Sequence, residues 1–177
     1  IILMIFAPVP PMALHINMFG SVDKFALMAV PFFIFAGEIM GHGGISKRIV
    51  AWVLSIIGGV RGSLALTTVG TCTVFGAISG SSPATIAAVG RLLYNPLRNA
   101  GYNEKFSSGL LASSGAIAIV IPPSISMILY GASAEQSVAL LFVAGVILRL
   151  VMSALRAAYI YPFALRTGIR EASGFSF

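Results

Sequence analysis

The sequence predicts an all-α membrane protein in which transmembrane helices accompany a re-entrant helical hairpin and a proline-broken helix. Of its 177 residues, 58% are hydrophobic and only 9% are charged, whereas soluble domains contain roughly 45–50% apolar and ~25% charged residues. The apolar residues fall in long runs, which indicates several membrane segments rather than one globular core. Two of these runs are interrupted, by a polar break at 79–83 and by a double proline at 122–123.

The N-terminal part of the chain contains two apolar segments of different kinds. Three prolines interrupt the run from Ile1 to Leu14, so we expect a truncated or interfacial segment there rather than a continuous helix. The chain opens on Ile1 rather than Met, which predicts a fragment. His15 lies in a mixed stretch expected to be a loop, and Phe25 to Gly41 is the first clean hydrophobic segment.

A short segment with a charged start, Ser46 to Ile57, follows a glycine-rich turn. It is about three turns long, too short to cross a bilayer core of ~30 Å. Its charged start and Trp52, which we expect to be buried, favour a helix lying at the membrane interface. The alternative is an ordinary helix packed in the bundle.

The remaining segments are the hairpin arms, the broken helix and the last span. Gly62 to Ile78 and Ala84 to Tyr94 flank the polar break, and Phe106 to Gly131 contains the double proline. Val138 to Phe163 is the last hydrophobic span.

The positions of the basic residues favour a hairpin over two full crossings. If Gly62 to Ile78 crossed the membrane, Arg61 would lie on one side and Arg91 on the other. If the chain turns back at the break, eight cations share the cytoplasmic side, as the positive-inside rule requires. These cations are Lys47, Arg48, Arg61, Arg91, Arg98, Lys105, Arg166 and Arg170. Lys24 remains on the opposite face with Asp23 and Glu135.

The polar break has the composition of an ion or anion site. Ser82 is a good N-cap and Pro83 fits a first helical turn, so a helix N-terminus that attracts anions should begin there. Pro83 also lacks the N–H that would bond the carbonyl of Ser79. The free carbonyl and the hydroxyls form an all-oxygen set, which suits a hard cation such as Na⁺.

The double proline repeats this pattern, because Pro122 and Pro123 leave the carbonyls of Ala118 and Ile119 without helical donors. Ser124 adds a hydroxyl. Two discontinuous segments with small polar residues are typical of a secondary-transport site. The alternative is a proline-kinked helix beside a glycine-lined packing seam.

At these residues the sequence resembles the large membrane subunit of the tripartite ATP-independent periplasmic (TRAP) transporters. The similar stretches are Val30–Met40, Gly43–Ser46, Gly76–Ser81, Ala100–Tyr102 and Ile121–Gly131. They cover most of the chain from about Asp23 to Gly145, in order, and their combination is specific although no single stretch is.

The resemblance implies a permease subunit of a Na⁺-coupled symporter in a bacterial inner membrane, crossed several times. It implies import of organic acids, such as C4-dicarboxylates or sugar acids, that a periplasmic substrate-binding protein delivers. A small membrane subunit and membrane lipid would be its other partners, and no cofactor besides the coupling ion is expected. The fold implied is the first of two inverted repeats, moving as an elevator.

On this basis the chain divides into scaffold helices with the interfacial helix (1–61), a transport hairpin with the broken helix (62–132), and a scaffold helix with a cytoplasmic loop (133–177). The residues expected to bind substrate are Ser81, Ser82, Thr85 and Ser124. The residues expected to bind Na⁺ are Ser79, Gly80, Ser81, Ala118, Ile119 and Pro122.

Several features leave other interpretations open. Arg149 and Arg156 interrupt the last span, where pairing with an acid, a subunit contact, snorkelling or a degraded copy would explain them. Glu38 could pair with a cation of the interfacial helix. Scattered cations without interleaved aromatic residues argue against nucleic-acid binding. The sequence contains neither a nucleophile elbow nor an HExxH motif, so it does not predict an enzyme. The alternative function is a passive channel or a non-transporting scaffold.

Overall fold

The computed structural model describes residues 10–120 and 122–167, and every regular element in them is helical, as predicted. The elements are α2 (Pro11–Val22), η1 (Phe25–Met28), α3 (Ala29–His42), α4 (Ile45–Ile57), α5 (Ser63–Ser79), α6 (Ser82–Asn99), α7 (Glu104–Ala116), η2 (Ile117–Ile119), α8 (Ile125–Ser133) and α9 (Val138–Thr167).

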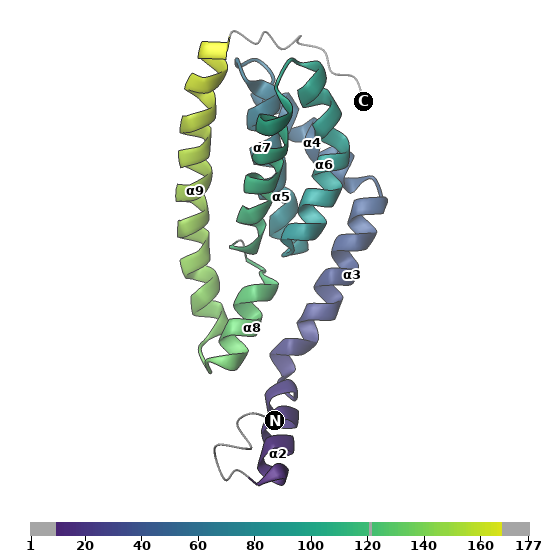
Figure 1. Ribbon diagram of the computed structural model, residues 1–177, viewed down its shortest axis with the longest axis vertical. Helices are drawn as coiled ribbons and strands as arrows, with labels where there is room; N and C mark the ends of the chain where they lie inside the picture. Colours follow the sequence, from purple (N-terminus) through teal and green to yellow (C-terminus); the bar gives the residue numbers. More distant parts are fainter. Residues whose placement is uncertain (1–9, 121, 168–177) are drawn as a thin grey trace.

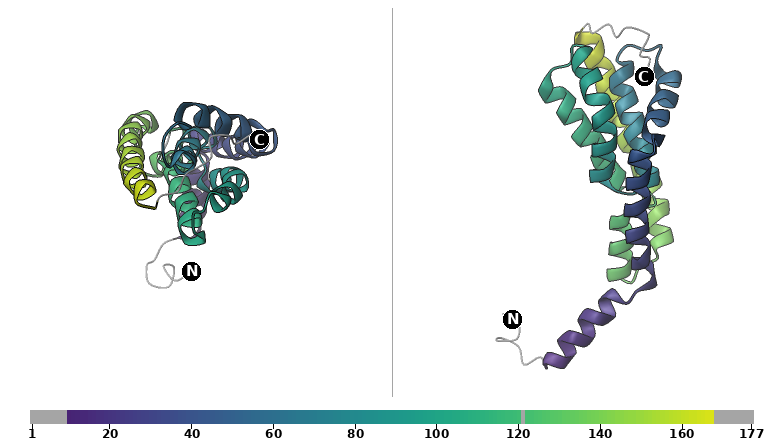
Figure 2. Two further views of the ribbon diagram at one scale, coloured as in Figure 1. Left: turned by 90° about the horizontal axis from the view of Figure 1, so that it is seen from above. Right: turned by 90° about the vertical axis from the view of Figure 1, so that its right-hand side faces the viewer.

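Helix α2 corrects the loop expected around His15. Pro11 occupies the first helical position, where its fixed φ fits and its missing N–H leaves no intrahelical bond unmade. Figure 2 shows α2 leaving the direction of α3 at an angle. Most of the segment expected from Ile1 to Leu14 lies outside the described residues.

Within residues 10–120 and 122–167, two helical stretches are long and apolar enough to cross a membrane. They are Phe25–His42, with 18 residues, and Val138–Ala164, with 27 residues. At a rise of 1.5 Å per residue they measure about 27 and 40 Å, against a hydrocarbon core of ~30 Å. Most of their side chains point away from the rest of the protein, as expected of helices that face lipid.

Helix α5 is the centre of the fold. It packs against α4, α6, α7 and α9, and eleven of its residues are buried. Its small residues allow these close approaches: a side chain at Gly70 would come within 2.8 Å of Val53 on α4. The core that results includes Leu64, Cys72 and Phe75 of α5, all almost fully buried.

Helix α4 packs on α5 through Val50 and Val53, which are buried. Trp52 is 57% exposed, so the expectation that it is buried was wrong. At 100° per residue, Trp52 falls beside this packed face rather than on it. The helix is therefore a packed member of the bundle with an apolar outer face.

Several basic residues lie near helix ends at one end of the molecule. Figure 1 shows the α4–α5 connection, the α6–α7 connection and the C-terminal end of α9 at one end of the molecule, and the α8–α9 connection toward the other. Arg61 lies in the first connection, Arg98 in the last turn of α6, and Lys105 in the first turn of α7. Three of the eight cations predicted to share a side thus gather at one end.

Candidate functional site

The α5–α6 turn forms the tip of a helical hairpin. Gly80 ends α5 in the left-handed region, with φ 60°, and its N–H bonds the Gly76 carbonyl at 2.8 Å. The N-cap of α6 is Ser81 rather than Ser82, and the Ser81 side chain makes no capping bond. Ser82 and Pro83 instead occupy the first two helical positions, where proline is tolerated.

A compact oxygen cluster holds this tip together. The Ser79 and Thr85 hydroxyl oxygens are 3.0 Å apart, and the Thr85 hydroxyl donates to the Ser81 carbonyl at 2.8 Å. The Ser81 N–H donates to the Ser79 hydroxyl at 3.4 Å. Ser79 and Thr85 are both fully buried, so these oxygens sit inside the protein, where polar groups require partners.

The second break separates α7 and η2 from α8. Ser124 caps α8, because its hydroxyl accepts a bond of 3.3 Å from the Met127 N–H. The same hydroxyl donates to the Ile119 carbonyl. The Ile119 carbonyl, predicted to have no helical donor, thus accepts from a side-chain hydroxyl in place of a backbone N–H. Ala118 is fully buried and Pro122 is half-buried.

The two breaks lie against each other. The Ile125 N–H at the start of α8 donates to the Gly80 carbonyl at 3.4 Å. A side chain at Gly80 would collide with the Pro123 carbonyl oxygen and lie 3.6 Å from the Ser124 Cα. Figure 1 shows the hairpin tip at the level of the α7–α8 break, partway along α9. The structure thus brings residues of the predicted substrate and ion sets to one place.

Sequence reasoning missed part of this site. Pro123 and Ile125 contact the hairpin tip through backbone atoms, which leave no mark on the sequence. Gly37 of α3 also belongs here, since a side chain at Gly37 would lie 3.3 Å from the Ser79 Cβ and 3.8 Å from the Ala84 Cβ. A glycine within an apolar helix indicates close packing against another helix, and this is the sequence signal that could have identified Gly37.

The arginines of α9 have partners that were not expected. Arg149 donates from Nη2 to the Thr73 carbonyl of α5 at 2.6 Å, and Arg156 donates to the Ser113 carbonyl of α7. The hydroxyls of Thr73 and Ser153 are 3.4 Å apart beside the first contact. Both guanidinium groups therefore join α9 to the hairpin and the broken helix through backbone oxygens rather than through acids.

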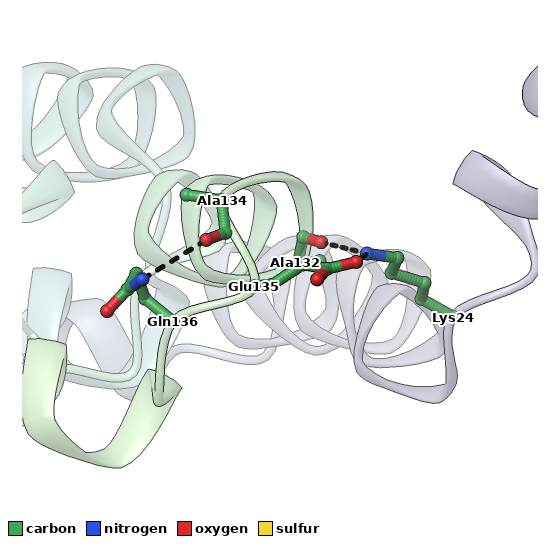
Figure 3. A network of polar contacts seen from close by, with 5 residues as sticks. All are labelled: Lys24, Ala132, Ala134, Glu135 and Gln136. Atoms are coloured by element: carbon green, nitrogen blue, oxygen red, sulfur yellow. Dashed lines mark hydrogen bonds and ion pairs between the residues drawn. The ribbon is translucent and has the colours of Figure 1, made fainter.

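Two other charged groups have local partners. Glu38 lies 3.5 Å from His42 one turn later, rather than pairing with a cation of α4. Lys24 donates to the Ala132 carbonyl at 2.5 Å and lies 3.4 Å from the Glu135 carboxylate (Figure 3). The second contact confirms that Lys24 and Glu135 share one face, and it joins η1 to the end of α8.

The fold and the site define an α-helical protein with helices long and apolar enough to span a membrane and with two helix breaks that meet. Residues 1–176 match the family model of the tripartite ATP-independent periplasmic transporter DctM component. The chain belongs to this family of TRAP transporter large permeases, which confirms the resemblance. Its relatives are transporter permeases rather than enzymes.

The names of curated relatives mention several different substrates. The chain is 43% identical over 150 residues to the isethionate TRAP transporter permease of Oleidesulfovibrio alaskensis, covering 85% of this chain and 24% of that protein. It is 38% identical over 162 residues to the C4-dicarboxylate large permease of Pseudomonas aeruginosa, covering 92% and 38%. It is 41% identical over 153 residues to the ectoine/5-hydroxyectoine large permease of Ruegeria pomeroyi, covering 86% and 36%. The chain thus spans well under half the length of these relatives.

Proposed function

We propose that this chain supplies half of the ion and substrate site of a Na⁺-coupled symporter that imports organic acids across the bacterial inner membrane. One observation carries the proposal: the hairpin tip at Gly80 lies against the α7–α8 break at Pro123. Two interrupted helices whose ends converge inside the bundle are the arrangement in which secondary transporters bind ions and substrates.

The oxygens at the tip suit the coupling ion. Na⁺ is a hard cation that prefers oxygen ligands, and the tip offers the hydroxyls of Ser79 and Thr85 with the carbonyl of Ser81. Hydroxyl and carbonyl oxygens have two lone pairs each, so those already hydrogen-bonded can still face an ion. Ser124 supports this region by capping α8, and Ala118 and Ile119 belong to η2, which contacts both arms of the hairpin.

The substrate carboxylate would be attracted by helix N-termini. Both α6 and α8 begin at the breaks, where their N–H groups and positive dipole ends are concentrated. Ser81, Ser82 and Thr85 lie at the start of α6, so their hydroxyls can add hydrogen bonds. The C4-dicarboxylate, isethionate and ectoine named for the relatives all carry an anionic carboxylate or sulfonate group.

The membrane arrangement follows from charge. Placing the cation-rich end in the cytoplasm makes α5–α6 a re-entrant hairpin whose tip stops within the membrane. The remaining length of the permease would supply the second, inverted repeat, and residues 62–132 would move against the scaffold parts 1–61 and 133–177 as an elevator. A periplasmic binding protein and a small membrane subunit would complete the transporter.

The test is uptake by the complete permease, reconstituted into liposomes with its small subunit and its binding protein. Succinate, isethionate and ectoine would be supplied in turn. We expect uptake of a substrate only when Na⁺ and the binding protein are both present outside the liposomes. Uptake that persists when K⁺ replaces Na⁺ would refute the coupling, and flux without the binding protein would indicate a channel.

A further inference from the structure

A cavity of about 230 Å³ lies between α7 and α9, apart from the two helix breaks. Its lining consists of Lys105, Phe106, Gly109, Leu110, Ser113, Arg156, Tyr159 and Ile160. None of these lining residues belongs to the hairpin tip or to the α7–α8 break, and none is acidic. The cavity therefore combines two cations with a largely apolar wall.

The two cations differ in depth along the bundle. Lys105 is exposed in the first turn of α7, at the end of the molecule where the basic connections gather. Ser113 lies eight residues further along α7, about 12 Å deeper at the rise of an α-helix. Arg156 is fixed at that depth by its bond to the Ser113 carbonyl. A guanidinium group has five N–H donors, so this one bond leaves others for a ligand.

The wall of the cavity is suited to an acyl chain. Leu110 and Ile160 are buried at its floor, 7% and 2% exposed. Phe106 stacks on Phe163 at 4.4 Å between ring centroids, and Tyr159 stacks on the same ring at 6.3 Å. Gly109 leaves space, because no atom lies within 4 Å of the position its Cβ would take.

Tyr159, one of the lining residues, belongs to the exposed outer face of α9. Tyr159 is 67% exposed and Leu155, one turn earlier, is 65% exposed. Tyrosine with a neighbouring cation is typical of the level where headgroups meet the hydrocarbon core. Basic pockets between helices at the cytoplasmic side are suited to anionic lipid headgroups.

We propose that this cavity binds an anionic phospholipid of the inner leaflet, with its phosphate between Lys105 and Arg156. Its glycerol and first methylene groups would lie against Gly109 and Ile160, and the rest of an acyl chain would continue past Arg156 toward Leu155. The placement in the inner leaflet rests on the proposed membrane arrangement. The lipid would also explain why α9 carries an arginine at this depth: the anionic phosphate offsets the cost of a cation near hydrocarbon. It would fill the space between α7 and α9 near the cytoplasmic end.

The experiment is native mass spectrometry of the complete permease with its small subunit, incubated with phosphatidylglycerol or with zwitterionic phosphatidylcholine. We expect phosphatidylglycerol to remain bound in preference to phosphatidylcholine. Lys105→Gln should lower its occupancy roughly fivefold, the change that about 1 kcal/mol per interfacial cation gives. Arg61→Gln is the matched control, an exposed cation at the same end that does not line the cavity, and it should leave the occupancy unchanged.

A second variant tests the shape of the site without changing its charge. Gly109→Phe should exclude the lipid by filling the cavity, whereas Gly20→Phe on α2, which also has open space around it, should not. Wild-type occupancy in both Lys105→Gln and Gly109→Phe would overturn the proposal. Displacement of the lipid by inorganic phosphate alone would also overturn it. So would a Tyr159→Cys variant whose thiol is protected from labelling by the small subunit rather than by lipid. Lipid counts do not depend on uptake, so they separate this proposal from the transport function.

Discussion

The carbonyl oxygen of Gly80 accepts a hydrogen bond of 3.4 Å from the backbone N–H of Ile125. This bond joins the last turn of one interrupted element to the first turn of the other. Because Gly80 has φ 60° and no side chain, the hairpin tip can approach the Pro123 carbonyl closely enough to form it. A single glycine therefore controls how the two breaks meet.

Replacing this glycine should disable the site. In Gly80→Ala the new Cβ would collide with the Pro123 carbonyl oxygen, and the left-handed backbone would add about 1–2 kcal/mol of strain. We expect the complete permease to lose most of its uptake and to melt at a lower temperature. Gly101→Ala is the control, since Gly101 also has a positive φ, of 98°, but open space around it. Uptake per folded protein should survive in the control, and equal uptake in both variants would contradict the prediction.

The buried hydroxyl of Thr85 should contribute to the Na⁺ dependence of uptake. Thr85→Val keeps the volume but removes the oxygen that lies 3.0 Å from the Ser79 hydroxyl. Losing one ligand worth ~1–2 kcal/mol should raise the Na⁺ concentration for half-maximal uptake about tenfold. Thr68→Val on the same hairpin is the matched control, because Thr68 is equally buried and its hydroxyl donates to the Leu64 carbonyl, one turn back in the same helix. An equal shift in both variants would mean that lost stability, not a lost ligand, is responsible.

Sequence reasoning located the breaks but not their contact. Glycine and proline act locally, so Gly80 and Pro122 mark where helical segments stop, and Pro83 marks where the next helix begins. The bond between Gly80 and Ile125 uses a backbone C=O and a backbone N–H. Every residue other than proline has both groups, so no sequence pattern predicts this bond. Arg149 escaped prediction for the same reason, since its partner is the Thr73 carbonyl rather than an acid.

Helix α9 should be cross-linkable to the hairpin. The Thr73 and Ser153 hydroxyl oxygens are 3.4 Å apart, so a Thr73→Cys, Ser153→Cys pair is close enough for a disulfide. We expect a cross-link on mild oxidation, detected as a mobility shift after protease cleavage between α5 and α9. The background should carry Cys72→Ala to remove the natural thiol. Ser137→Cys paired with Thr73→Cys is the control, about 24 Å further along α9, and should not cross-link.

The two contacts of Lys24 should differ in importance. Its bond to the Ala132 carbonyl caps the C-terminal end of α8 with a positive charge at 2.5 Å, whereas Glu135 has an 84% exposed side chain. An exposed ion pair contributes about 0–1 kcal/mol, and a cation at a helix C-terminus adds a further 0.3–1 kcal/mol or so. Lys24→Met should therefore increase protease cleavage between α8 and α9 more than Glu135→Gln does. Equal cleavage in both variants would assign the whole effect to the ion pair.

The re-entrant arrangement predicts which loops label from the same side of the membrane. If α5 and α6 form a re-entrant hairpin, a cysteine in the α4–α5 connection and one at the end of α6 both face the cytoplasm, and a cysteine between α8 and α9 faces the periplasm. Arg61→Cys, Asn99→Cys and Gln136→Cys, each in a Cys72→Ala background, test this with a maleimide that does not cross membranes. In intact spheroplasts only Gln136→Cys should react, and Arg61→Cys and Asn99→Cys should react after the membrane is opened. Reaction of Arg61→Cys and Asn99→Cys from opposite sides would mean that α5–α6 does not return to the side from which it entered. The cytoplasmic placement of the basic residues and the proposed position of the ion site within the membrane would then both be wrong.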